Sequence, residues 1–236
     1  MKVVKRELFE IRLIVWETRY VPLIDGDNVD IYVRVTFDPT GWADDQVEKR
    51  TDVHSNSKTG WGSFNWRFKF DLEVPCDFPR IKFMIHDDGV FVDESIGEAT
   101  INLKKSISKL QKEGFVEVPK TYISCWNTNM KDVERGKSKL VDFFHFYFIG
   151  ILMFSLTMLP KEEADADPVG ESWDEPNHSP FLKKPTAGRG FGSSFGGGFS
   201  WDFEWNPFGK LLPILAVLFV ILFILTIIMW WRLLKS

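Results

Sequence analysis

An uncharged apolar segment near the C-terminus constrains the fold of this 236-residue chain more than any other feature. Residues 211–231 read LLPILAVLFVILFILTIIMWW and contain no charged side chain. A helix of these 21 residues rises about 32 Å, roughly the thickness of the hydrocarbon core of a bilayer. We therefore predict a single transmembrane helix over residues 210–232, followed by a short tail over 233–236.

The rest of the chain has the composition of one domain in a reducing compartment. Residues 1–160 are enough for one hydrophobic core and too few for two. The net charge of −4 gives no indication of a nucleic-acid partner. Cys76 and Cys125 lie far apart and fit no metal or redox spacing, and charges interrupt the apolar N-terminus, unlike a signal peptide. We expect a single-pass, C-terminally anchored membrane protein with its domain in the cytosol, and the organelle stays open.

Residues 7–103 alternate between apolar and polar side chains in short runs separated by Gly, Pro and Asp. In SFNWRFKF, residues 63–70, the apolar side chains alternate with Asn65, Arg67 and Lys69, which predicts a half-buried strand with a basic outer face. Several short strands of this kind favour an antiparallel β-sandwich. The expected strands are residues 8–17, 30–37, 47–54, 63–70, 80–86 and 96–103.

Residues 143–159 permit two interpretations. The segment is uncharged apart from His145 and is nearly long enough to be a second membrane span. However, Leu152, Phe154 and Leu156 would share one face of a strand, and a proline and an acidic run follow. We predict the closing strand of the sandwich. A second span would reverse the topology of the chain.

Residues 161–209 are predicted to be a linker between the sandwich and the membrane helix. The part 161–176 is acidic and poor in helix-forming pattern, and the part 188–199 is rich in glycine. The predicted domain boundary therefore lies at residue 160.

Acidic residues cluster in two connections that would meet at one end of a sandwich. Converging carboxylates suit calcium, which takes six to eight oxygen ligands. The alternative is that Asp and Gly build ordinary surface turns. Apolar residues beside these acids could enter a lipid interface. The acidic residues are Asp25, Asp27 and Asp30 in the first connection, and Asp87, Asp88, Asp93 and Glu94 in the second. The apolar residues are Leu23, Ile24, Val90, Phe91 and Val92.

Several of these segments together resemble the membrane-proximal C2 domain of the ferlin family. The matching segments are FEIRLIVWETRYVPL (9–23), DNVDIYVRVTF (27–37), KRTDVHSNSKTGWGSFNWRFKF (49–70), DESIGEATINL (93–103) and LPKEEADADPVGESWDEPNHSPFLKKP (159–185). The resemblance covers almost the whole chain. It implies an eight-stranded sandwich of permuted, type II strand order, and a membrane anchor. It also implies calcium-triggered phospholipid binding in vesicle trafficking, membrane fusion or membrane repair.

The resemblance also implies a set of calcium ligands, and here the sequence departs from the family pattern. The implied ligands are Asp25 or Asp27, Asp30, Asp87, Asp88, and Glu94 or Asp93. A competent third loop reads D-x-D, several residues, and D before Ile-Gly. Counting back from Ile96 places Glu94, Asp88 and His86 at these positions, so the motif is shifted to Asp87 or lacks a ligand. Ferlins carry several C2 domains, and whether this chain is complete or a reduced relative stays open.

Basic residues on neighbouring strands offer a calcium-independent alternative. They would form a shallow patch for phosphoinositide head groups, where each charge near an anionic leaflet contributes about 1 kcal/mol. The alternative is an ordinary solvated strand face. The patch residues are Arg34, Lys49, Arg50, Arg67 and Lys69.

Two classes of function follow from these features. The first is a C2-domain protein that engages phospholipid membranes. The second is an accessory subunit of a membrane protein complex, with a C2 domain that has lost calcium and serves for docking to other membrane proteins. No pattern of nucleophile, base and orienting acid is evident, so we expect no enzyme.

Overall fold

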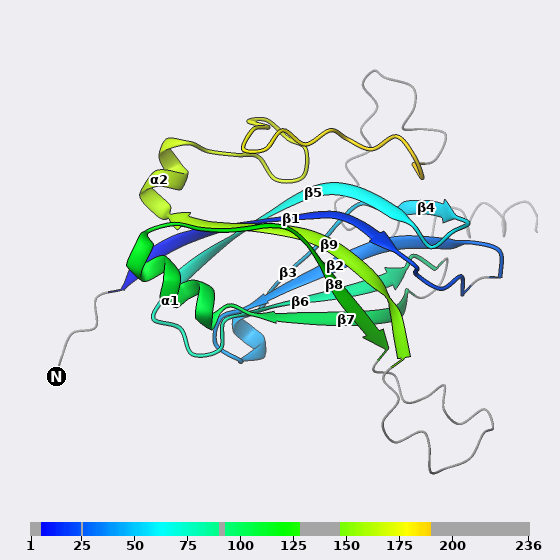
Figure 1. Cartoon of the computed structure of the whole chain (residues 1–236), viewed down its shortest axis with the longest axis horizontal. Helices are drawn as coiled ribbons and strands as arrows, with labels where there is room; N and C mark the ends of the chain where they lie inside the picture. The colour runs from blue at the N-terminus through cyan, green and yellow to red at the C-terminus, as the bar shows by residue number, and fades with distance from the viewer. Residues whose placement is uncertain (1–5, 25, 90–92, 128–146, 190–236) are drawn as a thin grey trace, which may run out of the picture. The chain divides into compact units, whose positions relative to one another are not determined.

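The computed structural model describes residues 6–24, 26–89, 93–127 and 147–189, which are drawn as the coloured ribbon in Figure 1. These residues form an antiparallel β-sandwich, so the predicted all-β fold class is confirmed. Its strands are β1 (Glu7–Arg19), β2 (Val29–Asp38), β3 (Val47–Arg50), β4 (His54–Ser57), β5 (Gly62–Val74), β6 (Arg80–Asp87), β7 (Glu94–Asn102), β8 (Val116–Asn127) and β9 (Tyr147–Pro160). The helices are η1 (Ala43–Asp45), α1 (Lys104–Glu113) and α2 (Lys161–Ala166).

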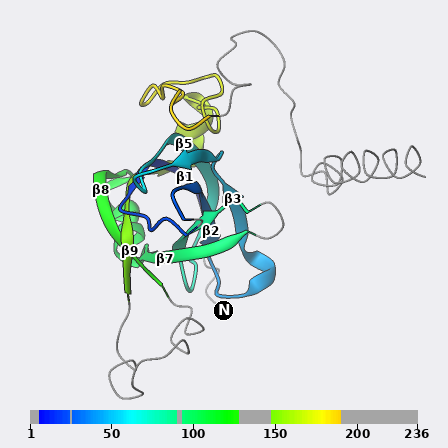
Figure 2. The ribbon, with the colours of Figure 1, turned by 90° about the vertical axis from the view of Figure 1, so that its right-hand side faces the viewer.

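The strands form two layers. One layer has the order β3-β2-β6-β7, with β4 also paired to β2, and the other has the order β8-β9-β1-β5. Within the described residues, the pair Glu98 and Trp126 joins the layers at the β7–β8 contact. Figure 2 looks at the end of the sandwich where β1 runs into β2 and β6 runs into β7. We call this end the loop end.

The first and last strands are neighbours, because β1 pairs with β5 on one side and with β9 on the other. Strand β9 also pairs with β8, so residues 147–160 form the predicted closing strand and not a membrane span. Residues 143–146 lie outside the described part of the chain. The core-facing residues Leu152, Leu156 and Met158 are at most 1% exposed.

The described residues contain nine strands, whereas the resemblance implied eight. The predicted strand 47–54 divides into β3 and β4, and β8 corresponds to none of the strand segments predicted from the sequence pattern. Thr51 causes the division. Its amide donates to the Val33 carbonyl (2.9 Å) and its hydroxyl oxygen accepts from the Val33 amide (3.0 Å). The chain turns at this point, and Asp52 leaves the strand direction. Helix α1 was not predicted, although Ile107 and Leu110 have helical spacing and pack into the core.

Residues 161–189 are folded against the sandwich, and we call them the strap. Figure 1 shows the strap running from α2 along β5 towards β4. Val169 and Leu182 in the strap are buried. The prediction that residues 161–189 form a linker is therefore wrong, and the folded unit extends beyond residue 160 to Arg189.

The membrane helix predicted over residues 210–232, the tail over 233–236 and the linker over 190–209 lie outside the described residues. Within the part of the chain that the structure describes, no helix is long and apolar enough to cross a membrane.

Candidate functional site

Three of the predicted calcium ligands meet at the loop end. Asp30 is the second residue of β2 and Asp87 ends β6, and the two strands are paired there. The Asp30 amide donates to Asp87 Oδ1 (2.7 Å), and the Asp88 amide donates to the Asp30 carbonyl (2.8 Å). Asp30 Oδ1 accepts from the Asn56 amide (2.6 Å), which fastens β4 to the same corner. The acids thus converge from two connections, and two carboxylate oxygens already accept backbone amides.

The other predicted calcium ligands of these two connections are not bonded to this corner by any of the contacts given above. Asp27 and Glu94 are exposed, and Asp25 lies outside the described residues. Among the residues that the structure describes, no group of three or more His, Cys, Asp or Glu side chains could hold a metal ion. Oxygen donors of this kind fit calcium by their chemistry, but the described side chains do not form a complete ligand set.

Of the apolar residues predicted to enter a lipid interface, the structure describes only the pair in the first connection. Leu23 and Ile24 are half-buried and pack against the core. Val90, Phe91 and Val92 lie outside the described residues. Leu23 and Ile24 therefore keep part of each side chain at the surface of the connection between β1 and β2.

His86 occupies the position where the ferlin pattern expects the first ligand of the third loop. Its ring stacks on Tyr32 with centroids 4.9 Å apart and an angle of 7° between the planes. The side chain is buried, and neither ring nitrogen has a hydrogen-bond partner among the described residues. Burial, followed by the charge of Arg34, lowers the pKa of His86 to about 4. At neutral pH this residue is therefore an uncharged packing group.

Arg34 and Arg50, two of the predicted head-group residues, lie together beside this stack. The Arg50 guanidinium lies 5.3 Å from the centroid of the Tyr32 ring. Arg34 donates to the Tyr32 hydroxyl (3.2 Å), and that hydroxyl donates to Asp93 Oδ2 (2.9 Å). These contacts link the basic part of the patch to the second acidic connection.

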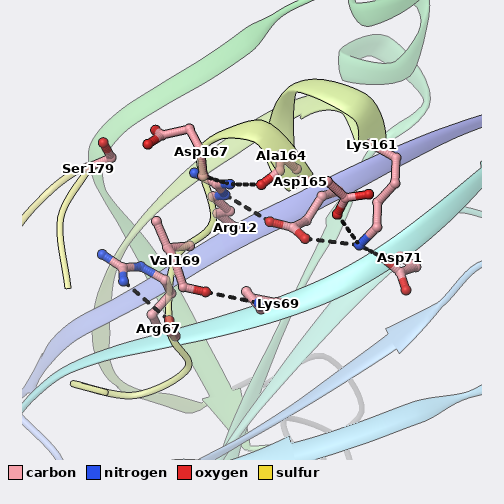
Figure 3. Close-up of polar contacts among 12 residues, drawn as sticks. Arg12, Arg67, Lys69, Asp71, Lys161, Ala164, Asp165, Asp167, Val169 and Ser179 are labelled. Carbon is pink, nitrogen blue, oxygen red and sulfur yellow. Dashed lines mark hydrogen bonds and ion pairs between the residues drawn. The ribbon is translucent and has the colours of Figure 1, made fainter. Parts of the chain in front are cut away.

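Arg67 does not belong to an open patch, so its predicted head-group role is wrong. Its side chain is 0% exposed and lies beneath the strap, as Figure 3 shows. Its guanidinium donates to the carbonyl oxygens of Gly170 (3.2 Å), His178 (2.8 Å) and Pro180 (2.6 Å). The alternation of β5 correctly predicted the outward face of Arg67 but could not indicate that the strap covers that face.

The strap also binds the other two predicted head-group lysines. Lys69 Nζ donates to the Val169 carbonyl (2.9 Å). Lys49 Nζ forms an ion pair with Glu171 and donates to the Lys69 carbonyl (2.9 Å). Both lysines are half-buried, so three of the five predicted patch residues hold the strap.

The start of the strap is held by an ion-pair network that begins at the buried Glu10 and Arg12 and reaches the exposed Asp71, also shown in Figure 3. Arg12 pairs with Glu10 (2.9 Å) and donates to the carbonyl oxygens of Ala164 (3.2 Å) and Asp167 (2.7 Å). Lys161 pairs with Glu10 (3.2 Å) and Asp71 (2.8 Å). Burial acts to raise the pKa of Glu10, but the hydrogen bonds from Arg12 and Lys161 outweigh it, and the pKa is lowered.

The middle of the strap closes the edge of β5, which is the terminal strand of its layer. Ser172 exchanges backbone hydrogen bonds with Arg67, at 2.8 and 3.4 Å. The Trp173 indole donates to the Phe64 carbonyl (3.1 Å) and packs edge-on against Trp66. An uncovered edge strand is a template for association, and the strap occupies it here.

Arg189 holds the end of the strap at the loop end. Its guanidinium donates to both carboxylate oxygens of Asp52 (2.7 Å each) and to the Ser63 carbonyl (2.6 Å). The Ser55 amide donates to the Gly188 carbonyl (2.6 Å). We call these contacts the Arg189 clamp. Sequence reasoning missed it, because Asp52 and Arg189 are 137 positions apart and neither belongs to a recognisable pattern.

Comparison with known proteins agrees with this architecture. The C2 domain family model matches residues 10–118. Ferlin 2 of Tetrahymena thermophila is 38% identical over 190 residues, which cover 78% of this chain. Ferlin 1 of Toxoplasma gondii is 30% identical over 183 residues, which cover 77% of this chain. The chain is a ferlin homologue with a C2 domain.

This ferlin homologue spans about a tenth of the length of the curated relatives it matches, 10% of Ferlin 2 and 12% of Ferlin 1. Among solved structures, it is similar to a C2 domain of plant extended synaptotagmin 1. That domain is 18% identical with a TM-score of 0.44, and the match covers 66% of this chain and 98% of that one.

Proposed function

We propose that this ferlin homologue binds phospholipid membranes through its loop end, in vesicle trafficking, membrane fusion or membrane repair. The observation that carries the proposal is the hydrogen-bonded corner of Asp30, Asp87 and Asp88 at the loop end, where the connection between β1 and β2 also carries the half-buried Leu23 and Ile24. Acidic groups next to apolar side chains bind lipid poorly until a cation offsets their charge. Calcium is the cation that these oxygen donors suit, with Asp25, Asp27, Asp93 and Glu94 as further donors.

Arg34 and Arg50 provide a second, calcium-independent contact with anionic head groups. They lie on β2 and β3, and their charges would add to attraction by the membrane surface. Lys49, Arg67 and Lys69 are left out of this contact because the strap engages them. Residues 210–232 complete the proposal as a membrane anchor, which would place the domain on the cytosolic side.

Co-sedimentation of residues 1–189 with vesicles tests the proposal. We expect more binding to phosphatidylcholine vesicles that contain phosphatidylserine than to phosphatidylcholine alone, and more with calcium than with chelator. D30N and D88N should remove the calcium-dependent part, because they remove ligand charge. R34A/R50A should lower the binding that persists in chelator, whereas K109A/K112A removes the same charge from α1 as a matched control.

The outcomes separate the parts of the proposal. Equal binding in calcium and in chelator would contradict the calcium site. Absence of binding to both kinds of vesicle would contradict membrane engagement.

The second candidate function is an accessory subunit of a membrane protein complex. It is favoured by the incomplete set of metal ligands among the described residues. In that case, native sizing after detergent extraction would give a stable large assembly, and residues 1–189 would not bind vesicles.

A further inference from the structure

The strap leaves part of the β8-β9-β1-β5 layer uncovered. Its start packs on the part of β1 and β9 that is farther from the loop end, where Arg12 donates to the carbonyl oxygens of Ala164 and Asp167. Its middle and end follow β5, and Figure 2 shows the strap above β5, with β8 and β9 on the left-hand side of the sandwich. Nearer the loop end, the outward side chains of β1, β8 and β9 are exposed or half-buried.

Paired residues of β1, β8 and β9 form this uncovered part. Tyr122 of β8 lies opposite Met153 of β9, which lies opposite Glu17 of β1. Directly paired residues point to the same side of a sheet, so these side chains share the exposed side of Tyr122. Trp126 lies four residues further along β8 and therefore on the same side. It pairs with Phe148 of β9, and the two rings pack edge-on with centroids 5.9 Å apart.

Four aromatic rings in this part of the layer are exposed to solvent, and we call them the aromatic face. Tyr122, Trp126 and Phe148 are 48%, 40% and 50% exposed. Trp61, which precedes β5, is 37% exposed. Aromatic side chains contribute most to binding when their large apolar area is buried. Several of them exposed together on neighbouring strands therefore indicate a contact surface.

The acidic group that contacts the aromatic face is compensated within the protein. Glu17 accepts hydrogen bonds from Arg19 (2.6 Å) and from the Trp61 indole (3.1 Å). Its carboxylate also accepts from the Tyr122 hydroxyl (3.5 Å). The Arg19 guanidinium lies 5.6 Å from the centroid of the Tyr122 ring. A surface that approaches these rings therefore meets Glu17 already paired with a cation.

A second cation lies beside the aromatic face. Lys120 Nζ is 3.5 Å from the ring centroid of Trp16, and the Trp16 indole donates to Ser155 Oγ (2.9 Å). The contacts of these rings thus include two cations, Lys120 and Arg19, and one carboxylate. This excess of positive charge suits an anionic surface.

A lipid bilayer matches the chemistry and the position of the aromatic face. Tyr and Trp combine an apolar ring with a polar tip, and they favour the boundary between head groups and acyl chains. Strand β8 ends and β9 begins at the loop end, where β1 runs into the connection that carries Leu23 and Ile24. A bilayer that meets the loop end therefore reaches the aromatic face without any further partner.

We propose that the aromatic face is a second lipid-contact surface, which binds the boundary region of a bilayer independently of calcium. The inference rests on the proposed function, since it takes the loop end to be the end that meets lipid. It adds a largely apolar contribution to binding, and it identifies the outer side of β8 and β9 as the side of the sandwich that lies against the head groups.

An environment-sensitive dye tests the contact directly. The dye is attached to residues 1–189, which contain the hydrophobic core described above. S124C places it at an exposed position between Tyr122 and Trp126. T100C is the matched control, because it places the dye at an exposed position of β7, in the other layer.

Both labelled variants also carry C76S, so that the dye reacts at one site. Cys125 can remain, because burial raises the pKa of its thiol to about 12. With phosphatidylcholine vesicles that contain phosphatidylserine, we expect the emission of the dye on β8 to shift to shorter wavelength, in calcium and in chelator. The emission of the dye on β7 should stay as it is in buffer.

Removal of two rings tests how much the aromatic face contributes. Y122A/W126A should weaken co-sedimentation with the same vesicles by about tenfold or more in chelator, because affinity for lipid depends on the apolar area that is buried. The loss should persist in about 1 M sodium chloride, where the Debye length is about 3 Å and attraction between charges is screened. F78A/F115A is the matched control, since it removes rings that are 57% and 45% exposed near the opposite end. A melting temperature close to that of the wild type shows that each variant is folded.

The outcomes separate this inference from the proposed function. A dye on β8 that stays in an aqueous environment while the fragment sediments with vesicles would overturn the inference alone, and so would equal shifts of the two dyes. Equal losses from the two double variants would also overturn it. No loss from Y122A/W126A is the result expected if the rings serve a protein partner, and it would overturn the lipid contact. Failure of residues 1–189 to sediment with any vesicle would overturn the proposed function and this inference with it.

Discussion

Arg67 is a buried cation whose described hydrogen-bond partners are three neutral carbonyl oxygens. Burial, followed by the charge of Arg12, lowers its pKa. We predict that R67A destabilises residues 1–189 by about 3 kcal/mol or more, because it leaves buried carbonyl oxygens without donors. Urea denaturation measures this change, and R6A should change stability by less than about 1 kcal/mol because Arg6 is exposed. Equal effects of R67A and R6A would show that the strap does not depend on Arg67.

Glu10 gives the start of the strap a dependence on pH. Its pKa in the folded protein lies below its ordinary value of 4.5, despite burial, because Arg12 and Lys161 bond to the ionised carboxylate. The stabilisation is therefore complete above about pH 4.5 and is lost as the pH falls through the lowered folded pKa. We predict that E10Q lowers the melting temperature at pH 7, and that the difference from the wild type shrinks towards pH 3. A difference that is constant between pH 7 and pH 3 would exclude this role for ionised Glu10.

The strap extends the folded domain from the predicted boundary at residue 160 to residue 189. We predict that residues 1–160 are less stable than residues 1–189, with a melting temperature lower by on the order of 10 °C, because the truncation uncovers Arg67 and the β5 edge. Differential scanning fluorimetry measures stability, and light scattering measures association through the edge. Two fragments that melt together and remain monomeric would contradict the structural role of the strap.

The strands could be predicted from the sequence because their signal is local, whereas the strap could not. Alternation within 63–70 indicates which side chains face outward, and alternation in Leu152, Phe154 and Leu156 distinguishes a strand from a membrane span. An acidic segment with several prolines and glycines has no such period. Its order depends on Arg67, which lies more than 100 positions away from the carbonyl oxygens it binds.

At the scale of the whole molecule, the candidate site was predictable only in part. Asp30, Asp87 and Asp88 lie at one corner because β2 and β6 are paired there. The alternation predicted individual strands, whereas the order of the strands came from the family resemblance. The predicted basic patch does not form one surface, because Arg34 and Arg50 lie beside Tyr32 whereas the strap covers Arg67. Alternation within one strand predicts which side chains face away from the core. Whether those side chains are exposed to solvent depends on the segments that pack over the strand.

The adjacency of β1 and β9 has a consequence for how the protein is made. The register joins Phe9 to Pro160, so the first strand cannot pair with the last until about 150 further residues have been synthesised. At 5–20 residues per second this delay is roughly 10–30 s, during which β1 lacks one of its two neighbours. The edge of β1 that β9 covers in the folded protein, which includes the backbone of Ile11 and Leu13, lacks its partner for that time. Folding of this domain is therefore completed only after β9 has been synthesised, and the nascent chain is a candidate client for chaperones that bind exposed apolar strands.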